Sequence, residues 1–274
     1  HILILILMPL AHALKKTPML IIFSILLNGI TMSAVTASEV TVITYGDSIT
    51  AGLKRTISGV VTCPQGVDVE PGRYGDPREV CYGNGALNVG GYQTDLVDAL
   101  SAAGFTPKIS NYGYSGISTD IMSSRRGSVL SSPGAQYVLI LGGANDAVDN
   151  VSRSTVLTNL KTIVNDVKSR GMIPVITTVT RNTSNGRMYD VITGRYAEDI
   201  RNYADSNNVL LADARAAMTD NWGSFHSGDG LHLGPLGDQT LADLYFQQMG
   251  LVGVGSDASI NSIPASLYLL LLSD

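Results

Sequence analysis

Basic clusters, cysteine, histidine and long apolar runs are all scarce in this 274-residue sequence. The 18 Lys and Arg residues are outnumbered by 23 Asp and Glu residues, which gives a formal net charge of −5. Nucleic-acid binding is excluded, because such a partner needs a concentrated positive patch to neutralise its phosphates. The length and the 45% of hydrophobic residues instead fit one sizeable α/β domain with its own core.

The apolar runs near the N-terminus are shorter than the roughly 20 residues that a membrane-spanning helix needs. Two such runs, residues 2–10 and 19–30, flank a pair of lysines, and small residues follow the second run. This order is typical of a secretory signal peptide, which we predict over residues 1–37 with cleavage after Ala37. We therefore expect the protein to be secreted, periplasmic or at the cell surface.

The opposite end, residues 251–274, combines a Gly/Ser-rich linker with a short apolar run. A proline motif before the run resembles the beginning of a bacterial sorting tail, but the run is too short to span a bilayer. A truncated reading frame and a segment that packs on the domain are the alternatives. Residues 38–250 are predicted to form one domain, and membrane contact is expected only through the leader or this tail, if at all.

The sequence contains only two cysteines, Cys63 and Cys81. No histidine lies near them to complete a zinc site, and we expect neither a metal nor another cofactor. Because the predicted leader implies an oxidising compartment, we expect the two cysteines to form a disulfide. Both belong to residues 54–89, a Gly- and Pro-rich stretch with no helical or strand period, and loops of this length are usually functional in a compact domain.

Apolar patterning predicts strands that alternate with amphipathic helices along the domain. Strands are expected at 40–44, 108–111, 136–141, 173–179 and 209–212, and helices at 91–104, 118–130, 154–170, 189–207 and 236–249. Such alternation predicts an α/β fold, a mostly parallel sheet with helices on both faces. Sites in these folds lie at the carboxyl ends of the strands.

The first predicted strand runs directly into Gly46-Asp47-Ser48. A strand that ends in these residues and continues into small ones indicates a sharp turn and a helix start. The Ser48 hydroxyl would then project from the strand end, with its backbone N–H near the positive end of the helix. That position suits a serine nucleophile, although Gly, Asp and Ser also form ordinary turns.

A serine nucleophile needs a base and a group that orients the base. After removal of the predicted leader, only His226 and His232 remain as histidines. His232 ends the segment Asp229-Gly230-Leu231-His232, in which the Asp229 carboxylate can turn back onto the imidazole ring. We therefore predict His232 as the base and Asp229 as its orienting acid. His226 has no carboxylate at this spacing, and Asp213, after a strand end, is the weaker alternative acid.

Backbone amides at Ser48 and Gly116 and the side-chain amide of Asn145 are the expected donors to an oxyanion. Each Gly-rich turn is weak evidence alone, but the ordered set of four motifs is specific. The motifs are Gly46-Asp47-Ser48, Asn111-Tyr112-Gly113-Tyr114-Ser115-Gly116, Gly143-Ala144-Asn145-Asp146 and Asp229-Gly230-Leu231-His232. This set resembles the SGNH/GDSL hydrolase family over residues 40–249.

The resemblance implies a flavodoxin-like three-layer α/β/α sandwich. It also implies Ser48 as nucleophile, Gly116 and Asn145 as oxyanion donors, and Asp229 and His232 as triad partners. The stretch Gly90-Gly91-Tyr92-Gln93 is similar to carbohydrate acetylesterase branches of the family, whereas lipolytic members share the four motifs. The long insertion at 54–89 departs from the family pattern where the pocket wall forms.

We therefore expect an exported, metal-independent serine esterase that hydrolyses short acyl esters, with acetylated carbohydrate as a candidate substrate. A lysophospholipase or thioesterase would use the same residues with a longer apolar acyl channel. A surface-displayed carbohydrate-binding domain on an esterase-like scaffold is the non-catalytic alternative. The expected partners are small-molecule or carbohydrate esters.

Overall fold

A computed structural model of the chain describes residues 37–52, 91–131 and 134–251. The predicted leader up to residue 36, the insertion with Cys63 and Cys81, and the segment 252–274 lie outside the described residues. The predictions for these parts of the chain therefore remain predictions.

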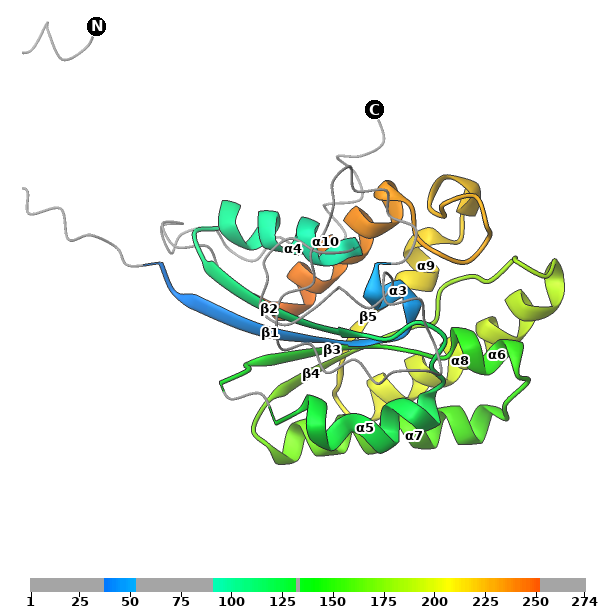
Figure 1. The fold of residues 1–274 in the computed structure, drawn as a ribbon, viewed down its shortest axis with the longest axis horizontal. Coiled ribbons are helices and arrows are strands. Elements are labelled where there is room, and N and C mark those ends of the chain that lie inside the picture. The colour runs from blue at the N-terminus through cyan, green and yellow to red at the C-terminus, as the bar shows by residue number, and fades with distance from the viewer. Residues whose placement is uncertain (1–36, 53–90, 132–133, 252–274) are drawn as a thin grey trace, which may run out of the picture. The chain divides into compact units, whose positions relative to one another are not determined.

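Five parallel strands form one sheet in the order β2-β1-β3-β4-β5 (Figure 1). The strands are β1 (Glu39–Gly46), β2 (Thr106–Gly113), β3 (Tyr137–Leu141), β4 (Ile173–Thr177) and β5 (Leu210–Ala212). This order, with β1 between β2 and β3, is that of flavodoxin-like folds, in which ligands bind where the strand order reverses. The parallel, flavodoxin-like sheet predicted from the sequence is confirmed.

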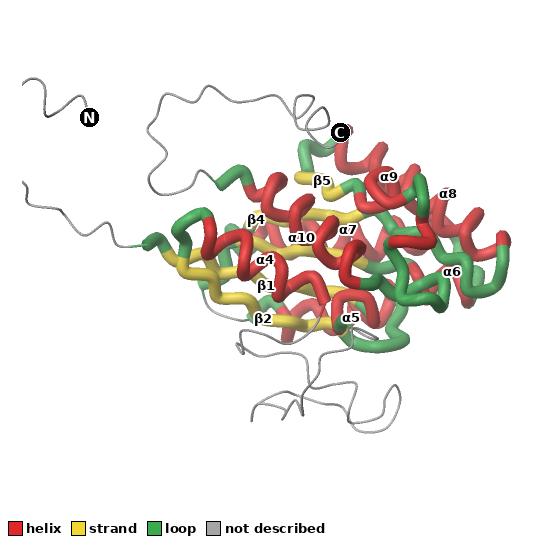
Figure 2. The backbone as a smooth tube through the Cα atoms, turned by 90° about the horizontal axis from the view of Figure 1, so that it is seen from above, coloured by secondary structure: helices red, strands yellow, loops and turns green. Residues whose placement is uncertain are grey.

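Helices cover both faces of the sheet, which confirms the three-layer α/β/α sandwich (Figures 1 and 2). On one face lie α4 (Gly91–Ala102) and α10 (Pro235–Met249), and on the other lie α5 (Thr119–Val129), α7 (Arg153–Ser169) and α8 (Arg187–Ser206). Short helices follow the ends of β1, β3 and β5: α3 (Ser48–Ala51), α6 (Ala144–Val148) and α9 (Ala214–Met218). The 3₁₀ turn η1 (Trp222–Ser224) lies between α9 and α10.

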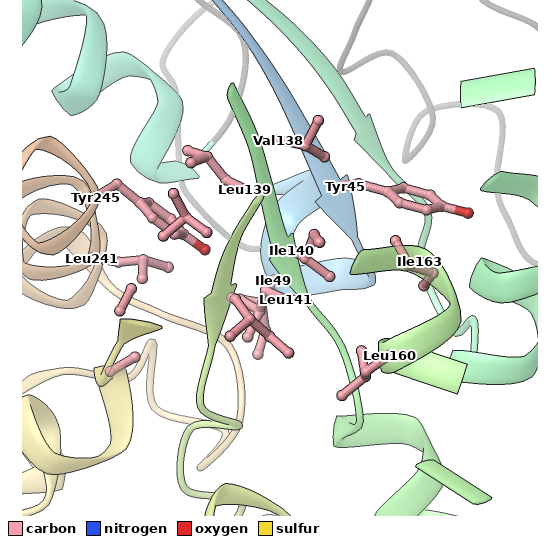
Figure 3. Close-up of a cluster of buried hydrophobic side chains, with 14 of the residues drawn as sticks. Tyr45, Ile49, Val138, Leu139, Ile140, Leu141, Leu160, Ile163, Leu241 and Tyr245 are labelled. Carbon is pink, nitrogen blue, oxygen red and sulfur yellow. The ribbon is translucent and has the colours of Figure 1, made fainter. Parts of the chain in front are cut away.

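The central strand β3 is buried along its whole length, as expected for a parallel strand covered on both faces. Figure 3 shows Leu241 and Tyr245 of α10 on one side of it and Leu160 and Ile163 of α7 on the other. These four side chains are at most 1% exposed. The apolar run at 136–141 therefore forms the centre of the core. It holds together the sheet, and the first three motifs lie at the carboxyl ends of its strands.

The strands β1 and β2 extend further than the apolar pattern predicted. Their pairing continues through Tyr45 with Tyr112 to Gly46 with Gly113. A polar and glycine-containing end gives no strand signal in the sequence, but backbone pairing to a neighbouring strand needs no apolar side chain. The extension brings the turn after β2 next to the turn that carries Ser48.

Candidate active site

Ser48 is the first residue of α3, directly beyond the end of β1. The Asp47 side chain caps this helix by accepting a hydrogen bond from the Ile49 N–H at 3.0 Å. Gly52 ends the helix in the left-handed conformation, with φ of 77°. The predicted strand, sharp turn and helix start are therefore present, and they hold the Ser48 side chain at the carboxyl edge of the sheet.

Two motif glycines allow this turn to pack closely against its neighbours. A Cβ atom at Gly46 would lie closer than 3.0 Å to the Thr50 side chain and to the Leu141 carbonyl oxygen. A Cβ atom at Gly113 would lie closer than 3.0 Å to the backbone of Thr50 and Ala51. Real Cβ contacts essentially never reach such distances, so only glycine lets the ends of β1 and β2 approach α3, and the end of β1 approach that of β3, this closely.

Helix α4 also holds α3 in place, through the side chain of Gln93. The Gln93 side-chain amide donates to the Thr50 carbonyl oxygen at 2.7 Å and to the Thr44 hydroxyl at 3.1 Å. Gln93 is 4% exposed. The first turn of α4 therefore fixes both the strand before Ser48 and the helix after it.

Ser48, His232 and Asp229 form one hydrogen-bonded chain. The Ser48 Oγ atom lies 2.9 Å from His232 Nε2, and His232 Nδ1 lies 2.7 Å from Asp229 Oδ2. Asp229 Oδ1 accepts the N–H groups of Leu231 and His232, each at 2.9 Å. The carboxylate thus orients the ring, and the other ring nitrogen is placed to accept the serine proton.

The alternative acid, Asp213, lies in a different environment. It forms a paired contact with the Arg201 guanidinium at 2.6 and 2.8 Å and accepts the Thr178 hydroxyl at 2.9 Å. Although burial raises the pKa of Asp213, the hydrogen bond from Arg201 holds it below its ordinary value. Asp213 also caps α9 by accepting the Ala216 N–H at 3.2 Å. These contacts give Asp213 a structural role, away from the hydrogen-bonded chain of Ser48.

The predicted oxyanion donors lie in the turns that follow β1, β2 and β3. Asn145, in the first turn of α6, donates one side-chain N–H to the Ile117 carbonyl oxygen at 2.9 Å, and the amide carries a second hydrogen. Ile117 directly follows Gly116, which adopts φ of 77°. Within the described residues, neither the Ser48 nor the Gly116 backbone amide donates a hydrogen bond. The oxyanion role of these three groups stays a prediction.

Asp146, for which the sequence predicted no role, fixes the turn beside Asn145. Its carboxylate accepts the Thr119 N–H at 2.9 Å and the Thr119 hydroxyl at 2.6 Å, which joins the start of α5 to α6. Burial raises the pKa of Asp146, and the hydrogen bonds from Thr119 oppose this shift. The sequence feature that could have pointed to this role of Asp146 is its position directly after Asn145 in the third motif.

Asn111, the first residue of the second motif, has a comparable role after β2. Its Oδ1 atom accepts the Gly113 N–H at 2.8 Å, which fixes the turn that leads to Gly116.

Among the described residues, no group of three or more His, Cys, Asp or Glu side chains is placed to hold a metal ion. No helix in the described ranges is long and apolar enough to cross a membrane.

Comparisons with known proteins bear on the fold and on the family. A family model for the GDSL-like lipase/acylhydrolase family matches residues 44–240. An acetylxylan esterase from Geobacillus stearothermophilus has 18% identity and a TM-score of 0.60, with 81% of this chain and 99% of that chain covered. A lipase/acylhydrolase from Enterococcus faecalis has 20% identity and a TM-score of 0.58, with 77% and 95% covered. None of the curated proteins gives a match.

At these identities the two solved structures show a shared fold. The family match carries more, because it extends over most of the chain and includes all four motifs from Gly46 to His232. The chain therefore belongs to the GDSL-like lipase/acylhydrolase family of carboxylic ester hydrolases.

Proposed function

We propose that the protein is an exported serine esterase that removes short acyl groups, with acetyl esters of carbohydrates as its substrate class. The observation that carries the proposed mechanism is the chain of hydrogen bonds from Ser48 through His232 to Asp229. This arrangement matches the requirements of acyl transfer to a serine, in which one imidazole both accepts and returns a proton.

In the first half-reaction, Ser48 Oγ attacks the ester carbonyl carbon while its proton passes to His232 Nε2. The carbonyl oxygen becomes an oxyanion, which the backbone amides of Ser48 and Gly116 and the Asn145 side chain stabilise by hydrogen bonding. The C–O bond to the alcohol then breaks, and His232 returns the proton to the leaving oxygen. An acyl-Ser48 ester remains.

In the second half-reaction, water attacks the acyl carbon and gives a proton to His232 Nε2. The second oxyanion uses the same donors, and its collapse releases the carboxylic acid and returns the proton to Ser48. Asp229 stays ionised throughout and stabilises the imidazolium form of His232. Its Oδ1 atom is held by two backbone N–H groups, which leaves Oδ2 directed at the ring.

The acetyl-carbohydrate assignment rests on two supports. A solved structure with the same fold is described as an acetylxylan esterase, which is a statement about that protein. The insertion at 54–89 is rich in Gly, Pro, Asp and Glu and poor in large apolar side chains, a composition that offers little surface for a long acyl chain. A lysophospholipase or thioesterase is the second candidate, because lipolytic members have the same motifs.

Export and the disulfide are part of the same proposal. The leader at 1–37 and the pair Cys63 and Cys81 support them, and the cysteines lie outside the described residues. Proteolysis of the unreduced, exported protein followed by mass spectrometry should yield the two cysteine peptides linked together. Two free thiols in freshly exported protein would contradict the disulfide.

The nucleophile is tested by covalent labelling. A serine-directed phosphonate should inactivate the protein and add its mass to the peptide that contains Ser48. Ser48→Ala should neither react nor hydrolyse p-nitrophenyl acetate, while its circular dichroism and melting temperature stay close to those of the wild type. Hydrolysis by the variant within tenfold of the wild type, with an unchanged fold, would overturn the assignment of Ser48.

A further inference from the structure

His226 lies in the same segment as the predicted base His232, but the sequence predicted no role for it. In the structure its Nδ1 atom accepts two backbone hydrogen bonds, from the Gly228 N–H at 2.9 Å and from the Gly230 N–H at 3.1 Å. These two glycines are the immediate neighbours of Asp229. The His226 ring therefore holds the backbone on both sides of the carboxylate that orients His232.

The loop that contains Asp229 is closed at its base next to His226. The Ser227 N–H donates to the His232 carbonyl oxygen at 2.8 Å, and His226 pairs with Leu233 in an antiparallel bridge. Within the loop, Gly228 and Gly230 adopt φ of 96° and 78°, conformations that non-glycine residues rarely adopt. The His226 ring nitrogen is the side-chain acceptor that joins these two left-handed residues.

The ring can accept these bonds in one form only. A nitrogen that accepts N–H groups must present its lone pair, so Nδ1 carries no hydrogen and the ring is neutral with hydrogen on Nε2. The ring also packs against Trp222, with centroids 5.4 Å apart and planes at 42°. Trp222 is 5% exposed and belongs to the core, so it seats the imidazole on a rigid surface.

A second contact holds the loop from outside. The Thr183 N–H, in the segment between β4 and α8, donates to the Gly230 carbonyl oxygen at 2.8 Å. Gly230 is therefore held through its N–H by His226 and through its carbonyl by Thr183. Loss of the His226 bonds would leave the loop attached but less precisely placed, so its effect should be smaller than loss of a triad member.

We propose that His226 is a positioning residue for the triad: its Nδ1 atom sets the Gly228–Gly230 turn so that the Asp229 carboxylate meets His232. The inference rests on the proposed function. A displacement of about 1 Å in a supporting group can reduce the rate by roughly 10²-fold, because the reacting atoms leave their near-attack arrangement. His226 touches neither Ser48 nor the predicted oxyanion donors in the hydrogen-bond pattern of the described residues.

A matched pair of variants separates the acceptor from the shape of the side chain. His226→Asn places an amide oxygen on the same Cγ atom as Nδ1, whereas His226→Leu has the same branching without an acceptor. With p-nitrophenyl acetate, His226→Leu should lower kcat by about 10- to 100-fold at an unchanged KM. The kcat of His226→Asn should be at least tenfold higher than that of His226→Leu. Ser224→Ala, in the neighbouring η1 turn, is the control and should retain wild-type kcat.

A spectroscopic readout tests the same inference without turnover. The wild type at pH 8 should show His226 as the neutral ring with hydrogen on Nε2, and a far-downfield proton on His232 Nδ1 from its short bond to Asp229. The downfield signal should disappear in His226→Leu and return in His226→Asn. Equal kcat and equal spectra for the two variants would overturn the proposal, as would hydrogen on Nδ1 of His226 in the wild type.

The two proposals fail in different ways. A wild-type protein that shows these signals but hydrolyses no ester contradicts the proposed function and supports the role of His226 in the loop. An active wild type with indifferent His226 variants supports the proposed function and contradicts the positioning role. Because the wild-type spectrum alone tests the His226 tautomer, a leucine variant that fails to fold does not prevent the test.

Discussion

The Nε2 atom of His232 lies 2.9 Å from Ser48 Oγ, although 184 residues separate the two in the sequence. Ser48 is placed by β1 and the start of α3, and His232 lies in the loop just before α10. Helix α10 packs against α4, whose Gln93 in turn holds α3. The core that joins these helices therefore determines whether the nucleophile and the base meet.

The first prediction concerns the cooperation of these two residues. Ser48→Ala and His232→Ala should each reduce kcat by several orders of magnitude, because a hydroxyl without its base and a base without its hydroxyl are equally ineffective. The double variant should be no slower than the slower single variant within error. Steady-state kinetics with p-nitrophenyl acetate measures this. Additive losses would show that the two residues act independently.

The second prediction tests the close approach of β2 to α3. Gly113→Ala forces a Cβ atom against the backbone of Thr50 and Ala51, which cannot move without displacing the helix that begins at Ser48. We expect a loss of about 1–3 kcal/mol in the free energy of unfolding, as for overpacking, together with a reduced kcat.

The matched control for Gly113 is Gly127, a helical residue of α5 at which an added Cβ atom would have, apart from its chain neighbours and the backbone of its own helix, no atom within 4 Å. Gly127→Ala should be neutral or stabilising by up to about 1 kcal/mol, since alanine is the better helix former. Urea denaturation of both variants, with kcat measured in parallel, checks the comparison. Equal stabilities for the two variants would refute the argument from close approach.

The strand and motif positions were predictable because they depend on local patterns. The buried run of β3 is visible in the sequence, and so is the spacing of Asp229 from His232. In the structure, His232 bonds to Ser48 and Asp229 bonds to His232. The alternative acid Asp213 could not be resolved in this way. Its environment depends on Arg201 of α8 and on Thr178, which directly follows β4.

The supporting contacts were not predictable for a related reason. His226 was not predicted as the base because no carboxylate lies at a suitable spacing, but its partners are backbone amides in left-handed residues. The need for glycine at Gly113 likewise comes from a neighbouring element, α3. Sequence patterns report the side chains of an element, whereas these contacts depend on backbone positions that tertiary packing sets.

The third prediction concerns pH and Asp47. Burial raises the pKa of Asp47 from its ordinary value of 3.8 to about 7, with a smaller rise from the Asp146 charge, although the Ile49 N–H opposes the shift. Between about pH 4 and pH 7 the folded protein therefore holds a proton that the unfolded chain has released. This carboxyl group makes stability fall as pH rises through that range.

Asp47→Asn removes this titration while its amide oxygen can still cap α3 by accepting the Ile49 N–H. The stability of the variant relative to the wild type should therefore increase from pH 4 to pH 8. Urea denaturation at several pH values measures the difference, in which titrations common to both proteins cancel. A difference that stays constant with pH would show that Asp47 does not hold a proton in the folded state.

The last prediction concerns the length of the acyl chain. Each CH₂ group buried against apolar protein contributes about 0.8 kcal/mol, so an enzyme with a long apolar channel gains rate on longer esters. The insertion at 54–89 has few large apolar side chains from which to build such a channel. Because specificity follows differential binding of the transition state, kcat/KM should be highest from acetyl to butyryl and should fall beyond about eight carbons.

A series of p-nitrophenyl esters measures this profile, with Ser48→Ala as the background for spontaneous hydrolysis. An acetylated xylo-oligosaccharide should outperform p-nitrophenyl acetate if polar groups beside the site bind sugar hydroxyls, because binding energy from the remote part of a substrate can lower the barrier at the ester. Decanoyl esters or lysophospholipids as the best substrates would refute the carbohydrate assignment. The same triad would then serve a lipolytic enzyme, with the acyl chain bound on an apolar surface.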